Sequence, residues 1–534
     1  MGFTTFLESY KVAAVQFEPK LGKLEDNRRG IVDQAMYAAE KGAKLIVFPE
    51  MATSGYVWQD REEIAPFVET VPGETTRMLH KITSQYDCYV VVGLPEVDAD
   101  TGIFYNSAVL VGPEGILGCY RKTHLFAADP RWACEGKEDI PVFETKIGRI
   151  SILICMDSMY FEPSRLAALK GADIIAFPTN WVGEGNKPPS KTWCLRAKEN
   201  NLYWIAANRW GLERDAKFTG GSAVIGPSGE VLDSIISGDG IVFSEIPNPA
   251  NQEKKKLKKR KPRAYQNILL NPYLWQEGAT RPIHVAKPFD IVCVPIEEQQ
   301  SINLIRENIC RRIENVNFKS FYRLIVLPKI SFPDKVDSAL EVYQVILKEI
   351  ALEYGVYIVA CLDEAKDYGF CPVSFLVGPE GIFGQYSQVH VEKVSSEDSS
   401  FLTINLPFGR VGLLTGGDAE YPESYRVLAK QGADIIVVSS SSHVSYEAWM
   451  QRIWAFENDA VLAVASPTSS GESLVFLHSI VSLVSSNETP SILFQHFLPE
   501  MIEKVKGRPF LRRLNHHLYD QIVYDQYNIS NRKV

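Results

Sequence analysis

Residues 148–157 read GRISILICMD, a buried strand that runs directly into a reactive side chain. The run of β-branched and aliphatic residues predicts a central strand of a sheet. Cys155 follows at its end, and α/β proteins place their chemistry at the carboxyl edge of such strands. The stretch therefore predicts an α/β fold with a thiol at its reactive edge.

Two further strand ends carry ionisable groups. The apolar residues 45–48 lead through a proline to Glu50, and a segment that begins at residues 108–111 continues to Lys122. A carboxylate, an ammonium and a thiol are the parts that nucleophilic acyl transfer requires. In this hypothesis the carboxylate takes the thiol proton and later activates water, while the ammonium stabilises the oxyanion.

Seven groups of residues, in order over roughly residues 9–275, resemble motifs of the carbon–nitrogen hydrolase, or nitrilase, superfamily. The matching strings are FPE (48–50), YRKTHL (120–125), ICMD (154–157), FPTNW (177–181), RAKEN (196–200), ANR (207–209) and FTGGS with GPSG (218–229). The resemblance implies that Glu50 is the general base, Lys122 the oxyanion stabiliser and Cys155 the nucleophile. The family also uses a second glutamate, whose position Glu135 matches, to orient the lysine and the substrate.

The resemblance also implies an αββα four-layer sandwich. Alternating patterns agree with it, since they predict strands at 12–17, 45–48 and 89–94 and helices at 27–41 and 74–85. Loops that start near Tyr56 and Trp181 are expected to select the substrate, with Tyr56, Asn180 and Trp181 as binding residues. The nine cysteines show no CxxC pair or zinc spacing, so we expect no metal and no cofactor.

The chain is an internal duplication. LVGPEGI at 110–116 recurs at 376–382, and GAD at 171–173 recurs at 432–434. In this alignment the three reactive positions fall on residues that lack the chemistry. Glu50 falls on Lys329, Lys122 on Gln388 and Cys155 on Gly416.

The duplication predicts a competent domain at 1–285, a degenerate nitrilase-like domain at 286–490 without the Glu, Lys and Cys, and a C-terminal tail at 491–534. We expect the two domains to form an intramolecular pseudo-dimer with one active site, and other faces leave room for further homo-oligomerisation. The basic stretch 254–263 is interpreted as a solvated segment rather than an anion-binding patch.

Composition excludes several classes of protein. A net charge of −9 over 534 residues argues against a general nucleic-acid binder. No apolar run approaches the roughly 20 residues of a membrane span, and the N-terminus does not have the pattern of a signal peptide. A cytoplasmic location is therefore expected.

The residues after the cysteine favour one branch of the superfamily. Nitrile-hydrolysing members commonly have Trp-Glu there, whereas this chain has Met156-Asp157. The first hypothesis is an amidase that acts on the non-peptide C–N bond of small linear amides. It would hydrolyse them to an acid and ammonia through a thioester on the cysteine. The alternatives are an N-carbamoyl-amine or amino-acid amidohydrolase, then a nitrilase, and outside enzymes a scaffold or regulatory protein with a vestigial site.

Overall fold

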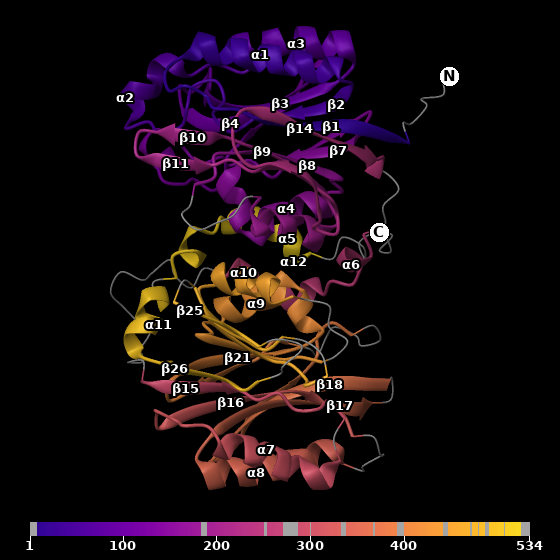
Figure 1. Ribbon diagram of the computed structural model, residues 1–534, viewed down its shortest axis with the longest axis vertical. Helices are drawn as coiled ribbons and strands as arrows, with labels where there is room; N and C mark the ends of the chain where they lie inside the picture. The colour runs from indigo at the N-terminus through magenta and orange to yellow at the C-terminus, as the bar shows by residue number, and fades with distance from the viewer. Residues whose placement is uncertain are drawn as a thin grey trace, which may run out of the picture. The chain divides into compact units, whose positions relative to one another are not determined.

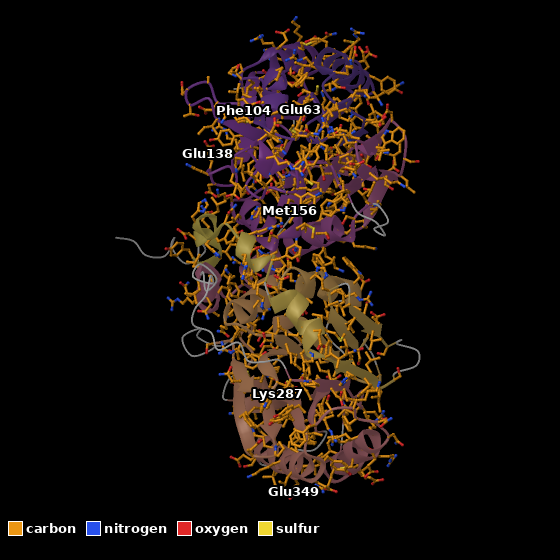
Figure 2. The ribbon with its side chains drawn as sticks, turned by 90° about the vertical axis from the view of Figure 1, so that its left-hand side faces the viewer. Glu63, Phe104, Glu138, Met156, Lys287 and Glu349 are labelled. Carbon is orange, nitrogen blue, oxygen red and sulfur yellow. The ribbon has the colours of Figure 1, made fainter. Side chains whose placement is uncertain are left out.

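The computed structural model divides into two compact units, residues 1–258 and 259–534. Both are built from two facing sheets with helices outside them (Figure 1). Figure 2 draws their side chains, with Phe104 and Met156 in the first unit and Lys287 and Glu349 in the second. The structure describes residues 8–182, 189–249, 254–270, 287–299, 301–332, 338–366, 369–391, 400–441, 447–469, 472–478, 480–485, 491–506 and 508–524.

The first unit is an αββα sandwich. Its two six-stranded sheets have the orders β14-β1-β2-β3-β4-β5 and β13-β12-β9-β8-β7-β6, and β1 and β2 lie against β9 and β8 of the other sheet. Helices α1 and α3 cover the first sheet, and α4 and α5 cover the second (Figure 1). The elements are β1 (Ser9–Gln16), α1 (Leu24–Glu40), β2 (Ala43–Val47), α2 (Arg61–Ile64), α3 (Glu74–Tyr86), β3 (Tyr89–Val97), β4 (Phe104–Gly112), β5 (Gly115–Arg121), β6 (Val142–Thr145), β7 (Gly148–Ile152), α4 (Phe161–Leu169), β8 (Ile174–Thr179), α5 (Lys191–Asn200), β9 (Tyr203–Asn208), β10 (Trp210–Glu213), β11 (Ala216–Thr219), β12 (Ser222–Ile225), β13 (Val231–Ile235), β14 (Gly240–Pro247) and α6 (Lys255–Lys258).

The predicted alternation of strands and helices is confirmed in this unit. Helices α1 and α3 place Ile31, Ala35, Leu79 and Ile82 against the sheet at helical spacing, and all four side chains are buried. Burying each large aliphatic side chain stabilises the fold by about 1.5–3 kcal/mol. The parallel strands β7, β8 and β9 lie inside the second sheet, so their carboxyl ends meet at one edge.

The second unit repeats this plan. Its sheets have the orders β19-β18-β17-β16-β15-β26 and β20-β21-β22-β23-β24-β25, and α7 and α8 pack on the first of them. The elements are β15 (Phe289–Cys293), α7 (Ile302–Glu314), β16 (Tyr322–Ile330), α8 (Ala339–Tyr354), β17 (Tyr357–Lys366), β18 (Gly369–Gly378), β19 (Gly381–Ser387), β20 (Thr403–Leu406), β21 (Gly409–Thr415), α9 (Pro422–Lys430), β22 (Ile435–Ser439), α10 (Ala448–Phe456), β23 (Val461–Ala465), β24 (Leu474–Leu477), β25 (Val481–Val484), β26 (Leu493–Phe497), α11 (Pro499–Lys506) and α12 (Asp520–Val523).

The predicted tail at 491–534 needs correction, because part of it completes this fold. Strand β26 pairs antiparallel with β15, as β14 pairs with β1 in the first unit. Without it, β15 would be an uncovered edge with unpaired backbone groups. The repeat therefore continues to at least Phe497, and the sequences of β14 and β26 have diverged while their place in the sheet has not.

The predicted domain boundary at 285/286 also needs correction. The chain divides at 258/259, and the short helical segment η5 (Pro262–Leu269) packs on α9 and α12 of the second unit. Arg260 is buried and its Nε donates to Glu423 Oε1 at 2.7 Å. The interpretation of 254–263 as a solvated segment is therefore wrong at Arg260, whose charge is neutralised inside the second unit.

Candidate active site

The turn that carries Cys155 has a strained backbone. The chain leaves β7 and enters a short 3-10 turn (Cys155–Met159), where Cys155 has φ +42°. Residues with a Cβ rarely adopt this left-handed conformation, and such strain is common at functional sites. Burial raises the pKa of the Cys155 thiol to about 12, so the thiol is protonated at neutral pH and needs a base.

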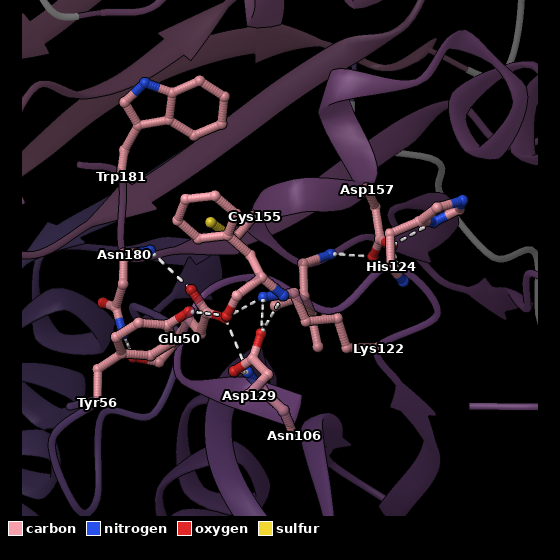
Figure 3. A network of polar contacts seen from close by, with 12 residues as sticks. Glu50, Tyr56, Asn106, Lys122, His124, Asp129, Cys155, Asp157, Asn180 and Trp181 are labelled. Carbon is pink, nitrogen blue, oxygen red and sulfur yellow. Dashed lines mark hydrogen bonds and ion pairs between the residues drawn. The ribbon is translucent and has the colours of Figure 1, made fainter. Parts of the chain in front are cut away.

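The base and the cation lie beside this turn, as Figure 3 shows. Glu50 follows β2, Lys122 follows β5, and both side chains are fully buried. Lys122 Nζ donates to Glu50 Oε1 at 2.7 Å. The structure therefore brings together the three groups that end separate strands in the sequence.

A glycine makes room for the Glu50 turn. A Cβ atom added to Gly93 on β3 would lie 2.6 Å from the Pro49 carbonyl oxygen and 2.7 Å from Glu50 Cα. The backbone of β3 holds this turn directly, because Ala52 N donates to Gly93 O at 2.8 Å. Only glycine allows the two backbones to approach so closely.

The second acid of the site is Asp129, which the sequence analysis did not identify. Asp129 is fully buried, and its Oδ2 accepts from Lys122 Nζ at 2.7 Å and from the Phe126 backbone N–H at 2.9 Å. Glu135 is exposed and makes no such contact in the described structure. The prediction that Glu135 orients Lys122 is therefore corrected: Asp129 occupies that place, because the loop after β5 folds back at residues 126–129.

Asn106 on β4 links the two acids. Its Nδ2 donates to Glu50 Oε1 at 2.8 Å and to Asp129 Oδ1 at 3.0 Å (Figure 3). No signal in the sequence analysis singled out this residue, since an asparagine inside a strand has no motif of its own. Glu50, Asp129, Lys122 and Asn106 together form one buried polar cluster.

The charges of the cluster act on one another. Burial raises the pKa of Glu50, and the Asp129 carboxylate adds to the effect, although Lys122 opposes it. Burial alone would lower the pKa of Lys122, but Asp129 and Glu50 more than offset it and hold that pKa well above its usual value. Lys122 is therefore a permanent cation, and Glu50 is a base of raised proton affinity.

Two of the three predicted substrate-binding residues lie at this cluster. Asn180 donates its backbone N–H to Glu50 Oε2 at 2.9 Å and its side-chain amide to the Glu50 carbonyl oxygen at 2.9 Å. The Tyr56 ring centroid is 6.0 Å from Lys122 Nζ. The Trp181 indole instead packs edge-on against Trp193, with 5.4 Å between the ring centroids, and it points away from the Glu50 carboxylate (Figure 3). Residues 183–188 of the second predicted loop lie outside the described residues.

A second buried network supports the Cys155 turn and is present in both units. Asp157 accepts from the backbone N–H of Ile154 at 2.8 Å and of His124 at 3.1 Å. In the second unit Asp418 accepts from the N–H of His390 at 2.8 Å in the same way. Because this network survives where the thiol is absent, its role is to hold the turn.

At the corresponding positions of the second unit, the replacing side chains bind their own neighbours. Lys329 Nζ binds Asp363 at 2.9 Å, and the Gln388 amide donates to the His390 carbonyl at 2.8 Å and accepts from Thr415 Oγ1 at 3.2 Å. Gly416 supplies no nucleophile. The described part of the chain contains no group of three or more His, Cys, Asp or Glu placed to hold a metal ion. It also contains no helix long and apolar enough to cross a membrane.

Comparison with known proteins identifies a family and several relatives. The carbon-nitrogen hydrolase family model matches residues 11–251 and 323–482. A nitrilase of Pyrococcus abyssi is 38% identical over 223 residues, which are 42% of this chain and 83% of that protein. A protein N-terminal amidase of Schizosaccharomyces pombe is 29% identical over an alignment 286 residues long, which covers 44% of this chain and 99% of that protein. A solved structure of the Nesterenkonia AN1 amidase, from the nitrilase superfamily, has 25% identity and a TM-score of 0.44 over 49% of this chain and 98% of that one.

The family model matches once within each compact unit, and together the matches cover more than half of the chain. The first match contains Glu50, Lys122 and Cys155, and the second contains the residues aligned with them, Lys329, Gln388 and Gly416. This chain therefore belongs to the carbon-nitrogen hydrolase family and is built from two tandem copies of the family domain.

Proposed function

We propose that the first unit hydrolyses a small linear carboxamide to a carboxylic acid and ammonia through a thioester on Cys155. The observation that carries the proposal is the fully buried pair of Glu50 and Lys122, 2.7 Å apart, beside a thiol on a strained turn. A base of raised pKa, a permanent cation and a protonated nucleophile match the requirements of acyl transfer.

In the acylation step, Glu50 takes the proton of the Cys155 thiol as sulfur attacks the amide carbon. A C–S bond forms, and the carbonyl π electrons move to oxygen, where the Lys122 ammonium stabilises the charge. The oxyanion then collapses and the C–N bond breaks. The proton held by Glu50 passes to the leaving nitrogen, and ammonia departs.

In the deacylation step, Glu50 takes a proton from water as the water oxygen attacks the thioester carbon. A second oxyanion forms beside Lys122, and its collapse breaks the C–S bond. The sulfur regains the proton from Glu50, so the enzyme returns to its starting state. The sum is amide plus water giving acid plus ammonia, with the base used twice.

Two other substrate classes use the same groups. An N-carbamoyl compound would be attacked at its ureido carbon and would release ammonia and carbon dioxide, and a nitrile would need a second water. Met156-Asp157 and the amidase among the relatives favour the amide first. The non-enzyme alternative, a scaffold with a vestigial site, predicts turnover of none of them.

The test is ammonia release from a panel of small amides, N-carbamoyl compounds and nitriles. Cys155→Ala should lower kcat by at least about 10³-fold on whichever class is turned over, because it removes the nucleophile. Cys134→Ala is the matched control, since Cys134 is an exposed cysteine of the same unit and should leave kcat unchanged. Retention of activity in Cys155→Ala would exclude the covalent mechanism.

A further inference from the structure

The duplication compares each buried polar residue of the active unit with its counterpart in an inert unit of the same fold. Residues that serve the fold should be retained, and residues that serve the chemistry are free to change. Asp157 is retained as Asp418, and Asn200 is retained as Asn458. Several buried polar residues have changed besides the base, cation and nucleophile. Asn106 is one of them, and it falls on Pro372.

The backbone at this position has kept its role in the fold. Lys122 N donates to the Asn106 carbonyl at 2.8 Å, and Gln388 N donates to the Pro372 carbonyl at 2.8 Å. Proline retains that carbonyl but has no side-chain donor. The strand therefore does not need the asparagine, and the side-chain amide was lost together with the Glu50 carboxylate that it contacts.

The Asn106 amide determines which acceptor positions of the Glu50 carboxylate are filled by hydrogen bonds. Each carboxylate oxygen accepts about two hydrogen bonds. Oε1 receives two, from Asn106 Nδ2 at 2.8 Å and Lys122 Nζ at 2.7 Å. Oε2 receives one among the described residues, from the Asn180 N–H at 2.9 Å, which leaves one acceptor position. Oε1 is thus saturated, and Oε2 is the oxygen with room for a proton.

We propose that Asn106 is a positioning residue that saturates Glu50 Oε1 and thereby reserves Oε2 for proton transfer with the thiol and with water. The inference rests on the proposed function, because it assigns the atom of Glu50 that acts as the base. Asn106 Nδ2 also donates to Asp129 Oδ1 at 3.0 Å and so holds the second carboxylate that binds Lys122. Each of the two acids therefore keeps its own position beside the one cation.

A purely structural asparagine in the same unit supplies the control. Asn200 is as buried as Asn106, and its Nδ2 also donates twice, to Ser164 Oγ at 3.1 Å and to the Arg196 carbonyl at 3.0 Å. In both residues Oδ1 lacks a hydrogen-bond partner in the described structure. Asn458 repeats the backbone contact in the second unit, at 2.7 Å to the Trp454 carbonyl.

The experiment measures the alkylation rate of Cys155 by iodoacetamide, and kcat and KM on the best substrate, against pH in the full chain. The variants are Asn106→Leu, the isosteric Asn106→Asp and the control Asn200→Leu. Glu50 must be ionised to act, so activity is present above its pKa and is lost as pH falls. Asn106→Leu loses a donor to the ionised form, so the acid limb of the pH–activity profile should move to higher pH, by about one unit. Asn106→Asp places a third carboxyl group beside Glu50, and the repulsion between the two carboxylates should move the acid limb in the same direction.

At neutral pH both Asn106 variants should lose about 10–100-fold in kcat with KM changed less than about threefold, since a bond to a charged group is lost at the base and not at the substrate. Asn200→Leu should lower the thermal midpoint and leave the acid limb in place. If the Asn106 variants fold and keep the wild-type acid limb, the inference is overturned. A wild-type Cys155 that reacts no faster than Cys134 overturns the proposed function, and the inference with it.

Discussion

Lys122 is the most constrained single residue of the site, because it binds two buried carboxylates at 2.7 Å each. Asp129→Asn removes one of these charges, so the ammonium is less firmly held and kcat should fall by about 10–100-fold. Glu135→Gln is the matched control, because this exposed acid lies in the same loop and should leave kcat within about twofold. Both rates are measured by ammonia release. An equal loss in the two variants would contradict the assignment of Asp129.

Single residues also mark the limit of what the sequence predicts. Glu50, Lys122 and Cys155 were predictable because each follows a recognisable strand and lies in a motif of the family. Strands β2 and β5 belong to one sheet of the sandwich and β7 to the other. Asp129 was not predictable, since it lies in a loop that also contains Glu135, Glu138 and Asp139. Which acid folds back depends on the turn closed by Phe126 N and Asp129 Oδ2 at 2.9 Å, and spacing alone carries no such information.

At the scale of elements, the packing of β3 against the turn after β2 sets the position of the base. Gly93→Ala should displace Glu50, because the new methyl group meets backbone atoms at 2.6 Å that cannot rotate away. Overpacking of this kind costs about 1–3 kcal/mol of folding free energy, and kcat should fall by at least about tenfold. Gly102→Ala is the control: its φ is +68° but no atom lies within 4 Å of the added Cβ. Thermal unfolding and kcat together check this. A stable Gly93→Ala enzyme with wild-type kcat would show that the approach of β3 does not position Glu50.

The elements themselves were largely predictable where their periodicity is strong, as in α1, α3 and the strands of the first sheet. The failures have one cause. Strand β26 and the segment η5 take their places from tertiary partners, β15 in one case and α9 and α12 in the other. Neither segment's own sequence identifies the partner on which it packs, so the sequence analysis assigned the first to a tail and the second to the wrong unit.

At the scale of the whole molecule, the second unit retains a fold without its chemistry. Its sheets enclose a full apolar core with residues from both, including Ile291, Leu324, Val411 and Val437, while Gly416 stands where the nucleophile would be. Selection would not preserve such a core in a unit without catalytic residues unless the unit had another role. We propose that the second unit serves the first as a tethered partner, so that one chain is a pseudo-dimer with a single site.

The proposal predicts the behaviour of a fragment that ends at Lys258, the boundary between the units; a cut at 285 would leave η5 without α9 and α12. Without its partner, the fragment should aggregate or self-associate to cover an exposed apolar face, and its kcat should be at least about tenfold below that of the full chain. Residues 259–534 supplied as a separate chain should restore activity, which distinguishes a partner from a mere folding tag. Active-site titration of the full chain should find one reactive thiol, at Cys155. Light scattering measures the association state of the fragment, and ammonia release measures its kcat. A monomeric fragment with full activity would contradict the role of the second unit as a partner.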